Sequence, residues 1–332
     1  MSTITQVPAS QTTAKRVLVV ILNWNSPQET LAAVESVLRM DYPNYSLMVV
    51  DNGSTDDSAE VLAKIDDPRV EFIKLPDNLG FSGGTGIGFD KAIQDGADYI
   101  WLLNNDLVTE PGTLSSLVRA AEEDPRIGLV SPLIASLQRP SIYIYAGGYF
   151  NPRTLAFGTT RDLQVAAQWA KDSPDTIMLL GTALLVRVEL VRKIGKMDAG
   201  LFAYWEDTDF SARSNAAGFR NVIDFASTIY HSEKFPTDTP EDIKPHFWYY
   251  NARNEIRFWR RYAGLIPCLR QIIWSYRLQL GHLNSLKNAE ISRQAILSGM
   301  WDGWLNKGGA YRGDRRMPRL IARAVQWHSR RQ

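Results

Sequence analysis

Four short strand-like runs in the first third of the chain, three of them wholly apolar, constrain its fold most strongly. They lie at residues 17–22, 47–50, 70–74 and 99–103, and segments with apolar residues at helical spacing separate them. Unbroken aliphatic and β-branched runs are typical of strands that are buried on both faces. Strands that alternate with helices predict a parallel sheet with right-handed crossovers. We therefore expect an α/β fold with a mostly parallel central sheet that is flanked by helices.

Two of these runs end in polar side chains, which are Asp51, Asn104, Asn105 and Asp106. Parallel strands present their carboxyl ends at one edge of the sheet, where ligands bind. A carboxylate at the position of Asp51 can accept hydrogen bonds from a nucleobase imide or a ribose hydroxyl. Asp106 can hold a hard divalent cation that keeps positions open for phosphate oxygens. Turn formation before Gly53 and helix capping near Pro111 are the structural alternatives.

A dense glycine cluster occupies residues 78–88 and leads into a helical pattern. Glycines near a helix start let backbone N–H groups approach a phosphate closely. The cluster is not a dinucleotide-binding fingerprint, because Phe89 stands where the third glycine would be required. This mismatch argues against a nucleotide-dependent oxidoreductase, which would share the alternating strand and helix pattern.

A second group of acids, Glu206, Asp207 and Asp209, stands at the start of a predicted helix that Gly218 could end. The helix dipole favours acids at this place, so a purely structural explanation exists. Asp209 and Arg213 also have the spacing of a helical ion pair. That pairing explains Asp209 better than it explains the two acids before it.

The C-terminal part of the chain differs in charge from the rest. Residues 245–332 carry a net charge of +12 and six of the ten tryptophans, whereas residues 1–244 carry −11. A basic, tryptophan-rich block suits an anionic membrane surface. Nucleic acid and a solvated helical face are the alternatives. Arg270 and Arg277 interrupt its most apolar stretch, so the block holds no run of the ~20 apolar residues that a membrane span needs.

Cysteine content and the first residues bear on the cellular compartment. The single cysteine, Cys268, excludes an internal disulfide and a cysteine-rich metal site, which suits a reducing cytoplasm. Residues 1–15 are polar and lack the apolar core of a secretory signal, so we expect a loose tail there.

Four motifs, in their order and spacing, resemble the family 2 glycosyltransferases, which are nucleotide-sugar enzymes of the GT-A fold. The motifs are Asn23-Trp24-Asn25, the Asp51 to Asp56 segment, the Asn78 to Gly84 segment and Leu102-Leu103-Asn104-Asn105-Asp106. The resemblance implies that Asp51 binds the nucleobase and that Asp106 is the metal carboxylate of the D-x-D signature, with Mg²⁺ or Mn²⁺ as the ion. The first acid of that signature is Asn104 here, as in many rhamnosyltransferase-like members.

The same resemblance implies a set of donor-binding residues. They are Asn23, Asn25, Asp51, Asn78, Gly83, Gly84, Asn104, Asn105 and Arg253. Arg253 could meet a phosphate, or it could pair with an acid of the protein body. Gly86 departs from the family, because relatives often carry asparagine there.

The acids at the second site resemble the acceptor-site signature of the family. This implies that Asp207 is the catalytic base and that Glu206 orients the acceptor. Inverting sugar transfer needs a carboxylate that takes the proton from the attacking hydroxyl. His231 is a candidate for completing the metal shell, although a lone histidine is more often an ordinary hydrogen-bonded residue.

The remaining sequence predicts further elements with less detail. We expect a helix over 111–123, strands over 127–134 and 142–149, and a hairpin or loops near the acceptor within 141–175. We also expect a short strand near 222–223, a mobile loop over 232–245 and helices over 266–286 and 289–305.

Together these features predict a GT-A domain over residues 16–244 and a basic helical region over 245–332. The expected enzyme moves a sugar from a nucleotide sugar, with dTDP-rhamnose or a UDP-sugar as donor, to a glycan or lipid-diphosphate-linked acceptor in bacterial cell-surface polysaccharide synthesis. We expect it at the inner face of the plasma membrane, in peripheral contact with anionic lipid and without a nucleic acid partner. A catalytically silent nucleotide-sugar-binding or scaffold protein is the alternative, because Asn104 replaces an expected acid.

Overall fold

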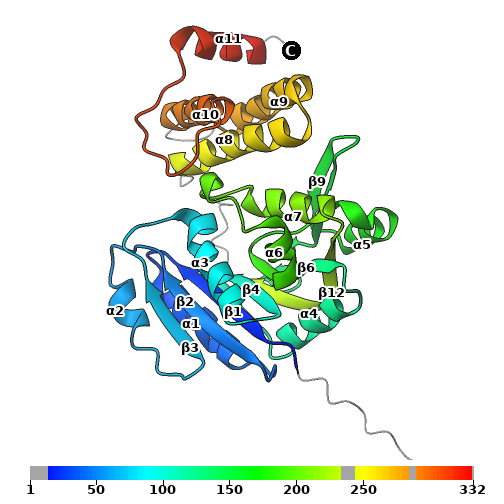
Figure 1. The fold of residues 1–332 in the computed structure, drawn as a ribbon. Helices are drawn as coiled ribbons and strands as arrows, with labels where there is room; N and C mark the ends of the chain where they lie inside the picture. Colours follow the sequence, from blue (N-terminus) through cyan, green and yellow to red (C-terminus); the bar gives the residue numbers. More distant parts are fainter. Residues whose placement is uncertain (1–13, 233–243, 284–288, 331–332) are drawn as a thin grey trace, which may run out of the picture.

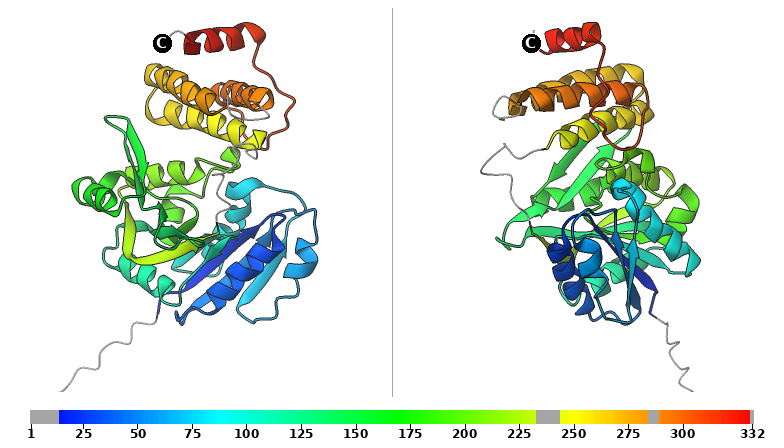
Figure 2. Two further views of the ribbon diagram at one scale, coloured as in Figure 1. Left: turned by 180° about the vertical axis from the view of Figure 1, so that it is seen from behind. Right: turned by 90° about the vertical axis from the view of Figure 1, so that its left-hand side faces the viewer.

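The computed structural model describes residues 14–232, 244–283 and 289–330. An α/β body forms one part of the molecule, and a stack of helices from the C-terminal part lies against one end of it (Figure 1). Two further views show the same arrangement from behind and from the side (Figure 2). The division into domains at residue 244 stays a prediction.

The body is built on one large mixed sheet. Its strands are β1 (Val17–Asn23), β2 (Tyr45–Asp51), β3 (Val70–Lys74), β4 (Tyr99–Asn104), β5 (Leu107–Val108), β6 (Ile127–Ser136), β7 (Tyr143–Tyr145), β11 (Ala183–Arg187) and β12 (Arg220–His231). The strand order is β3-β2-β1-β4-β11-β6-β12-β5, and β7 pairs with β6. The pairings make β3, β2, β1, β4, β6 and β12 parallel to one another, while β11, β5 and β7 run the other way. The prediction of a mostly parallel sheet is therefore confirmed.

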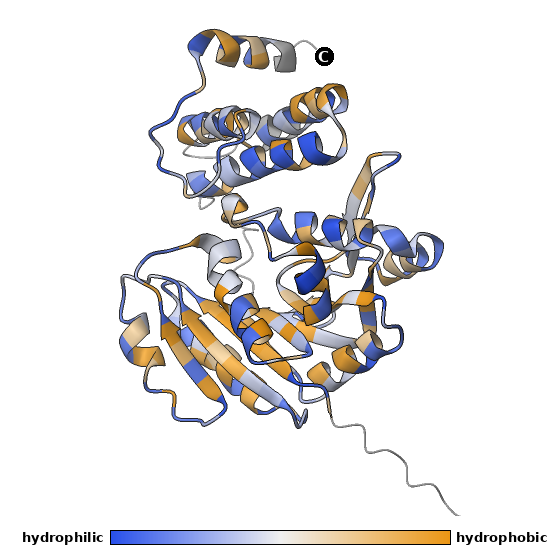
Figure 3. Ribbon diagram, viewed as in Figure 1, coloured by the Kyte–Doolittle hydropathy of each residue, from blue (hydrophilic) through white to orange (hydrophobic). Residues whose placement is uncertain are grey.

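Helices cover both faces of this sheet. They are α1 (Pro27–Leu38), α2 (Ser58–Leu62), α3 (Gly80–Gln94), α4 (Thr113–Glu122), α6 (Val188–Ile194) and α7 (Glu206–Ala216). Alternate side chains of β1 enter two separate cores: Val19 packs in the core that α1, α2 and α4 share, and Val20 packs in the core of α3, α6 and α7. Burial on both faces explains the unbroken apolar runs, which appear as hydrophobic strands in Figure 3.

The register of the strands brings their polar ends to one edge. Asn23 at the end of β1 pairs with Asp51 at the end of β2, and Leu22 pairs with Asn104 at the end of β4. The expected convergence of these side chains at the carboxyl edge of the sheet is thus confirmed for Asp51 and Asn104.

A small second sheet holds the segment that was hardest to predict. It has the order β10-β8-β9, with β8 (Gly147–Asn151), β9 (Ala156–Thr160) and β10 (Ile177–Met178). Strands β8 and β9 form the expected hairpin, but α5 (Leu163–Asp172) was not predicted. The predicted short strand near 222–223 is part of the longer β12, which contains an irregularity between Asp224 and Thr228.

The C-terminal helices are α8 (Pro245–Tyr262), α9 (Leu265–Leu283), α10 (Ala289–Trp304) and α11 (Arg319–Arg330). The two predicted helices are found as α9 and α10, whereas α11 was not predicted. Helices α8 and α10 pack closely, and two glycines of α10 make this possible. A Cβ on Gly299 would collide with the carbonyl of Tyr249, and a Cβ on Gly303 would collide with the carbonyl of Arg253. Within the described ranges, no helix is both long and apolar enough to cross a bilayer.

Two predictions fall largely outside the described residues. These are the loose tail over 1–15, of which only residues 14 and 15 are described, and most of the loop over 232–245. Nζ of Lys15 lies 3.5 Å from Oδ1 of Asp98, so an ion pair holds the chain to the body just before β1.

Candidate active site

The loop that precedes α7 has an unusual backbone. Phe202, Tyr204 and Trp205 all have positive φ angles, of 66°, 66° and 70°. Such conformations are costly for large side chains and persist where the surrounding structure imposes them, often at functional sites. The loop delivers Glu206 and Asp207 to the first turn of α7, beside an open pocket.

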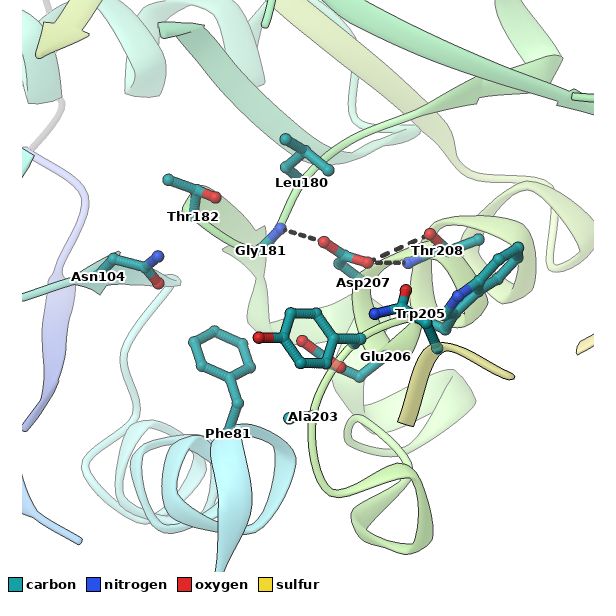
Figure 4. A pocket seen from close by; sticks show the side chains of 12 residues that line it. Phe81, Asn104, Leu180, Gly181, Thr182, Ala203, Trp205, Glu206, Asp207 and Thr208 are labelled. Atoms are coloured by element: carbon teal, nitrogen blue, oxygen red, sulfur yellow. Dashed lines mark hydrogen bonds between the residues drawn. The ribbon is translucent and has the colours of Figure 1, made fainter. Parts of the chain in front are cut away.

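The carboxylate of Asp207 is held by main-chain donors. The N–H of Gly181 donates to its Oδ2 at 2.9 Å, and the N–H and hydroxyl of Thr208 donate to Oδ1 at 2.6 and 3.2 Å. Figure 4 shows the carboxylate between these two residues. Burial raises the pKa of Asp207, while the hydrogen bonds from Gly181 and Thr208 oppose that rise because they favour the charged form.

Glu206 is in a different electrostatic state. Burial, followed by the nearby charge of Asp207, raises the pKa of Glu206 to about 8. Its Oε2 atom is buried without a hydrogen-bond partner among the described residues. A carboxyl with this pKa is mostly protonated at neutral pH, so Glu206 can donate a hydrogen bond but is a poor base there.

Asp209, the third acid of this group, has a structural role. Arg213 donates to its Oδ2 at 2.8 Å, as the helical spacing predicted. Arg261 and Tyr262 of α8 also bind Oδ1 of Asp209, the tyrosine at 3.2 Å. The carboxylate of Asp209 therefore joins α7 to α8.

An open pocket of about 520 Å³ brings the two predicted sites together. Its lining residues come from five parts of the chain and are Phe81, Asn104, Leu180, Gly181, Thr182, Ala203, Tyr204, Trp205, Glu206, Asp207, Thr208 and Asn251. We call this the catalytic pocket. Phe81 and Asn251 were not singled out from the sequence, although Phe81 belongs to the Asn78 to Gly84 segment that carried the resemblance.

The sheet edge beside the pocket is a polar network around Asp51. Asn23 donates to Oδ1 of Asp51 at 2.9 Å, and the Ser54 hydroxyl makes a short hydrogen bond to the same atom. The Oδ2 atom of Asp51 is buried without a hydrogen-bond partner among the described residues. Thr30 donates to Oδ1 of Asn23 at 2.7 Å, so Asn23 positions Asp51 and is itself held in place. Ser54 and Thr30 were not predicted as part of this network.

The other predicted donor-binding asparagines shape the loops around this edge. Oδ1 of Asn25 accepts the N–H of Thr55 at 2.8 Å, and Oδ1 of Asn78 accepts the N–H of Gly80 at 2.7 Å. The side chain of Asn105 donates to the hydroxyl of Thr30 at 3.0 Å.

The two predicted donor-binding glycines lie inside α3 and have a packing role there. A Cβ on Gly84 would lie 2.5 Å from a methyl carbon of Leu22, and one on Gly83 would lie 2.8 Å from Cβ of Leu79. Glycine at position 84 therefore lets α3 pack closely on β1. Contact between the donor and either glycine stays a prediction.

The two candidate metal ligands lie together. Nε2 of His231 is 3.5 Å from Oδ1 of Asp106, because β12 pairs with β5 and sets His231 opposite Leu107. Burial raises the pKa of Asp106, and the opposing influence of His231 lowers it. Oδ1 of Asp106 and Nδ1 of His231 are buried without hydrogen-bond partners in the described ranges. Gly112, not Asp106, is at the N-cap of α4, which removes the capping alternative.

This pair fits a divalent cation that takes only part of its coordination from the protein. Among the described residues, no group of three or more His, Cys, Asp or Glu side chains could hold a metal ion. Magnesium-type sites commonly combine one or two carboxylates with water and substrate phosphate oxygens. Asp106 and His231 suit that kind of site.

The position of Arg253 contradicts its predicted role in donor binding. The side chain is fully buried in α8, and its guanidinium donates to the carbonyls of Gly200, Leu201 and Gly309. It also stacks against the ring of Tyr250 at 5.0 Å. Burial lowers the pKa of Arg253. Because these donors bind main-chain carbonyls and the amide oxygen of Asn254, Arg253 fixes the loop before α7.

Comparison with known proteins also indicates a glycosyltransferase. The model of the glycosyl transferase family 2 matches residues 18–195. The chain is 26% identical to an N-acetylglucosaminyl-diphospho-decaprenol L-rhamnosyltransferase of Mycobacterium tuberculosis, over 58% of this chain and 68% of the relative. It is 25% identical to the galactofuranosyltransferase GlfT1 of Mycolicibacterium smegmatis, over 76% of this chain and 85% of the relative.

Two solved structures share the fold. A mannosyltransferase of Pyrobaculum calidifontis, in complex with GDP-Man and Mn²⁺, has a TM-score of 0.55 at 16% identity and covers 86% of this chain and 75% of its own. GalNAc-T7 with UDP, GalNAc and Mn²⁺ has a TM-score of 0.55 at 15% identity, over 79% of this chain and 55% of its own. The predicted GT-A fold is confirmed, and the family match excludes the oxidoreductase alternative. The protein is a glycosyltransferase and belongs to glycosyl transferase family 2.

Proposed function

We propose that the protein is an inverting, metal-dependent transferase that moves a sugar from a nucleotide sugar to a hydroxyl of a glycan or lipid-diphosphate-linked acceptor. The observation that carries this proposal is the place of Asp207. Its carboxylate lines the catalytic pocket, is oriented by the N–H of Gly181, and shares the pocket with Asn104 from the polar sheet edge.

The proposed reaction is a single displacement. Asp207 accepts the proton of the acceptor hydroxyl while that oxygen attacks the anomeric carbon, and the nucleoside diphosphate leaves from the opposite face. The N–H groups of Gly181 and Thr208 hold the carboxylate in the orientation for this transfer. Glu206, protonated at neutral pH, donates a hydrogen bond to an acceptor oxygen and so orients the acceptor.

The donor binds along the sheet edge in this proposal. Asp51 offers its unpartnered carboxylate oxygen to the nucleobase, and the Asn104 amide contacts the ribose or diphosphate. Asp106 and His231 would hold Mg²⁺ or Mn²⁺, which neutralises charge on the departing diphosphate when bound. The rhamnosyltransferase and galactofuranosyltransferase relatives support rhamnose or a similar sugar as the transferred group, and the proposed donor is dTDP-rhamnose or a UDP-sugar.

The C-terminal helices support a place at the cytoplasmic face of the plasma membrane. Several large apolar side chains of this region are exposed, namely Leu265, Ile266, Leu269, Trp274, Leu320, Ile321 and Trp327. Arginines stand among them, and the region carries a net charge of +12. Exposed apolar and basic side chains together favour peripheral binding to anionic lipid, where a lipid-linked acceptor would be available.

One observation favours a second candidate, a catalytically silent nucleotide-sugar-binding protein. Asn104 supplies a neutral amide where the D-x-D signature has its first acid. The buried Glu206 and the oriented Asp207 favour catalysis, since a protein that only binds has no need for a positioned base. Turnover separates the two candidates.

The test is the release of nucleoside diphosphate from a panel of dTDP-, UDP- and GDP-sugars. Each donor is incubated with the full chain, with Mg²⁺, Mn²⁺ or a chelator, and with candidate lipid-linked acceptors. Release from one donor that needs the metal and gives a product of inverted anomeric configuration supports the proposal. Metal-independent release or a retained configuration contradicts it, and donor binding without release under every condition favours the silent binder.

A further inference from the structure

A further pocket, of about 160 Å³, lies in the C-terminal part of the chain, between the end of α10 and the segment 308–315. Its side chains are mostly polar or aromatic and include Tyr249, Asp302, Tyr311, Arg312, Asp314 and Arg315. We call it the tail pocket. None of these residues takes part in the reaction proposed above.

Asp302 is the most informative residue of the tail pocket. Only 2% of its surface is exposed, and its Oδ2 accepts a hydrogen bond from the Tyr249 hydroxyl at 2.6 Å. Nη1 of Arg315 lies 3.5 Å from the same oxygen. The other oxygen, Oδ1, is buried without a hydrogen-bond partner among the described residues. A buried acceptor in this state is costly, and a donor group on a bound ligand would remove that cost.

The balance of charges indicates the class of ligand. Two acids, Asp302 and Asp314, stand beside two arginines, Arg312 and Arg315, so the pocket is close to neutral. A phosphate would meet the acids, and a metal ion would meet the arginines. A neutral ligand with many hydroxyl groups can donate to the carboxylates and accept from the guanidinium groups at the same time. A sugar is such a ligand.

The aromatic wall of the pocket suits the same ligand. The rings of Tyr249 and Tyr311 lie 4.5 Å apart, centroid to centroid, and both line the pocket. Tyrosine rings offer an apolar face together with a polar hydroxyl. The two rings face each other, and Arg253 lies over the ring of Tyr249, so the C–H groups of a sugar ring would pack on the edges of this pair. The pocket has room for about one ring.

The segment that forms the pocket is held firmly to the protein body. The N–H of Gly309 donates to the carbonyl of Gly200 at 3.0 Å, and Arg253 donates to the carbonyl of Gly309. The N–H of Tyr311 donates to the hydroxyl of Tyr250 at 2.8 Å. A site on a segment anchored in this way is largely preorganised, which lowers the entropic cost of binding.

The tail pocket lies near the catalytic pocket. Ala310 and Tyr311 also line an apolar pocket of about 450 Å³, and that pocket shares Phe81, Ala203 and Tyr204 with the catalytic pocket. The three pockets are therefore neighbours that share lining residues. We propose that the tail pocket binds one sugar unit of the glycan chain that the enzyme extends. The identity of that glycan rests on the proposed function, but the binding itself requires no turnover.

Photocrosslinking to the full chain tests this proposal. The probes are diazirine-bearing methyl glycosides of rhamnose, galactofuranose and N-acetylglucosamine, and crosslinked peptides are mapped by mass spectrometry. Ala310→Trp adds bulk at an exposed residue that lines the pocket, and Ala324→Trp adds the same bulk at an exposed residue of α11. Asp302→Asn keeps an acceptor for the Tyr249 hydroxyl but removes the negative charge.

The expected result is crosslinking of one glycoside within residues 302–315. Ala310→Trp should lower it by about tenfold or more by occupying the space of the ligand, and Asp302→Asn by a similar factor because a hydrogen bond to a charged group contributes that much to affinity. Ala324→Trp and Asp207→Asn should leave it unchanged. Absence of crosslinks in this segment, their persistence in Ala310→Trp, or their displacement by inorganic pyrophosphate would overturn the proposal. Glycoside crosslinking without any nucleoside diphosphate release would contradict the proposed function alone.

Discussion

The N–H of Gly181 donates a hydrogen bond to Oδ2 of Asp207 at 2.9 Å. Gly181 lies in the turn between β10 and β11, and Asp207 lies in the first turn of α7, so the bond joins the sheet to the catalytic helix. A Cβ at position 181 would lie 3.2 Å from the ring of Phe81, which limits the size of the residue there. The main chain thus orients the proposed base, and the small residue leaves the pocket open beside it.

Protonation of Glu206 should make the stability of the protein depend on pH. The pKa of Glu206 is raised to about 8 from the usual 4.5. Between these values the folded state keeps a proton that the unfolded state releases, so stability is greatest at the acidic end and falls as pH rises towards 8. Glu206→Gln should remove this loss, on the order of a few kcal/mol, in urea unfolding series between pH 5 and pH 8.5.

Glu255 provides the matched control for that series. It is a second buried glutamate, in α8, and burial raises its pKa to about 7. Glu255→Gln should flatten the pH dependence of the free energy of unfolding over a narrower pH range. It should leave acceptor-dependent turnover unchanged, whereas Glu206→Gln should impair turnover. Parallel stability curves for the native protein and Glu206→Gln would show that Glu206 is not protonated in the folded state.

Arg253 should be essential for stability rather than for donor binding. Arg253→Met removes a buried donor that the carbonyls of Gly200, Leu201 and Gly309 share, although Gly200 and Leu201 keep other donors, so we expect a loss of about 3 kcal/mol in the free energy of unfolding. Arg253→Lys should recover little, because one ammonium group cannot replace the planar fork. The control is Arg293→Met, which removes a partly exposed arginine from α10. If Arg253→Met unfolds like the native protein but binds the nucleotide sugar more weakly, the original prediction that Arg253 contacts a phosphate would be supported instead.

The metal should depend on both Asp106 and His231. Electron paramagnetic resonance of Mn²⁺, titrated in the presence of nucleoside diphosphate, measures its affinity without requiring turnover. Asp106→Asn and His231→Ala should each weaken Mn²⁺ binding by about tenfold or more, since each removes a ligand. Asp66→Asn, a carboxylate change before β3, should have no effect. Unchanged Mn²⁺ affinity in both ligand variants would place the ion elsewhere.

Helix α11 should contribute to membrane binding. Leu320 and Ile321 are 80% and 41% exposed, while Ala322 and Val325 pack against the other helices. In flotation with anionic liposomes, Leu320→Glu with Ile321→Glu should reduce the bound fraction severalfold, because apolar burial and charge attraction both weaken. Leu137→Glu with Ile142→Glu alters similarly hydrophobic residues of the body and should float normally. Equal flotation of both variants, or no preference for anionic lipid, contradicts this role.

The first half of the fold could be predicted because its strands are buried on both faces. The runs at β1, β2 and β4 have no polar interruption, so their position and the shared edge of Asp51 and Asn104 follow from the sequence. Helix α11 was missed although its apolar residues recur at helical spacing. Residues 177–186 form one apolar stretch in the sequence, whereas the structure divides this stretch into β10 and β11 around Gly181.

The site could be predicted as separate motifs but not as contacts. The sequence marked Asp106 and His231 individually, while their approach depends on the pairing of β12 with the two-residue strand β5, which is too short to recognise from a pattern. The role of Arg253 was mistaken because a sequence does not reveal which backbone carbonyls need a donor. Arg253 donates to the carbonyls of Gly200 and Leu201, which lie before α7.

The central claim is that Asp207 is the base, and the rate of acceptor-dependent nucleoside diphosphate release tests it most directly. Asp207→Asn is compared with Asp90→Asn, which makes the same chemical change in an exposed ion pair with Lys196. The account predicts that Asp207→Asn loses about 10²- to 10⁴-fold in rate while its donor affinity stays normal, and that Asp90→Asn matches the native enzyme. A rate for Asp207→Asn within a few-fold of the native enzyme would contradict the assignment.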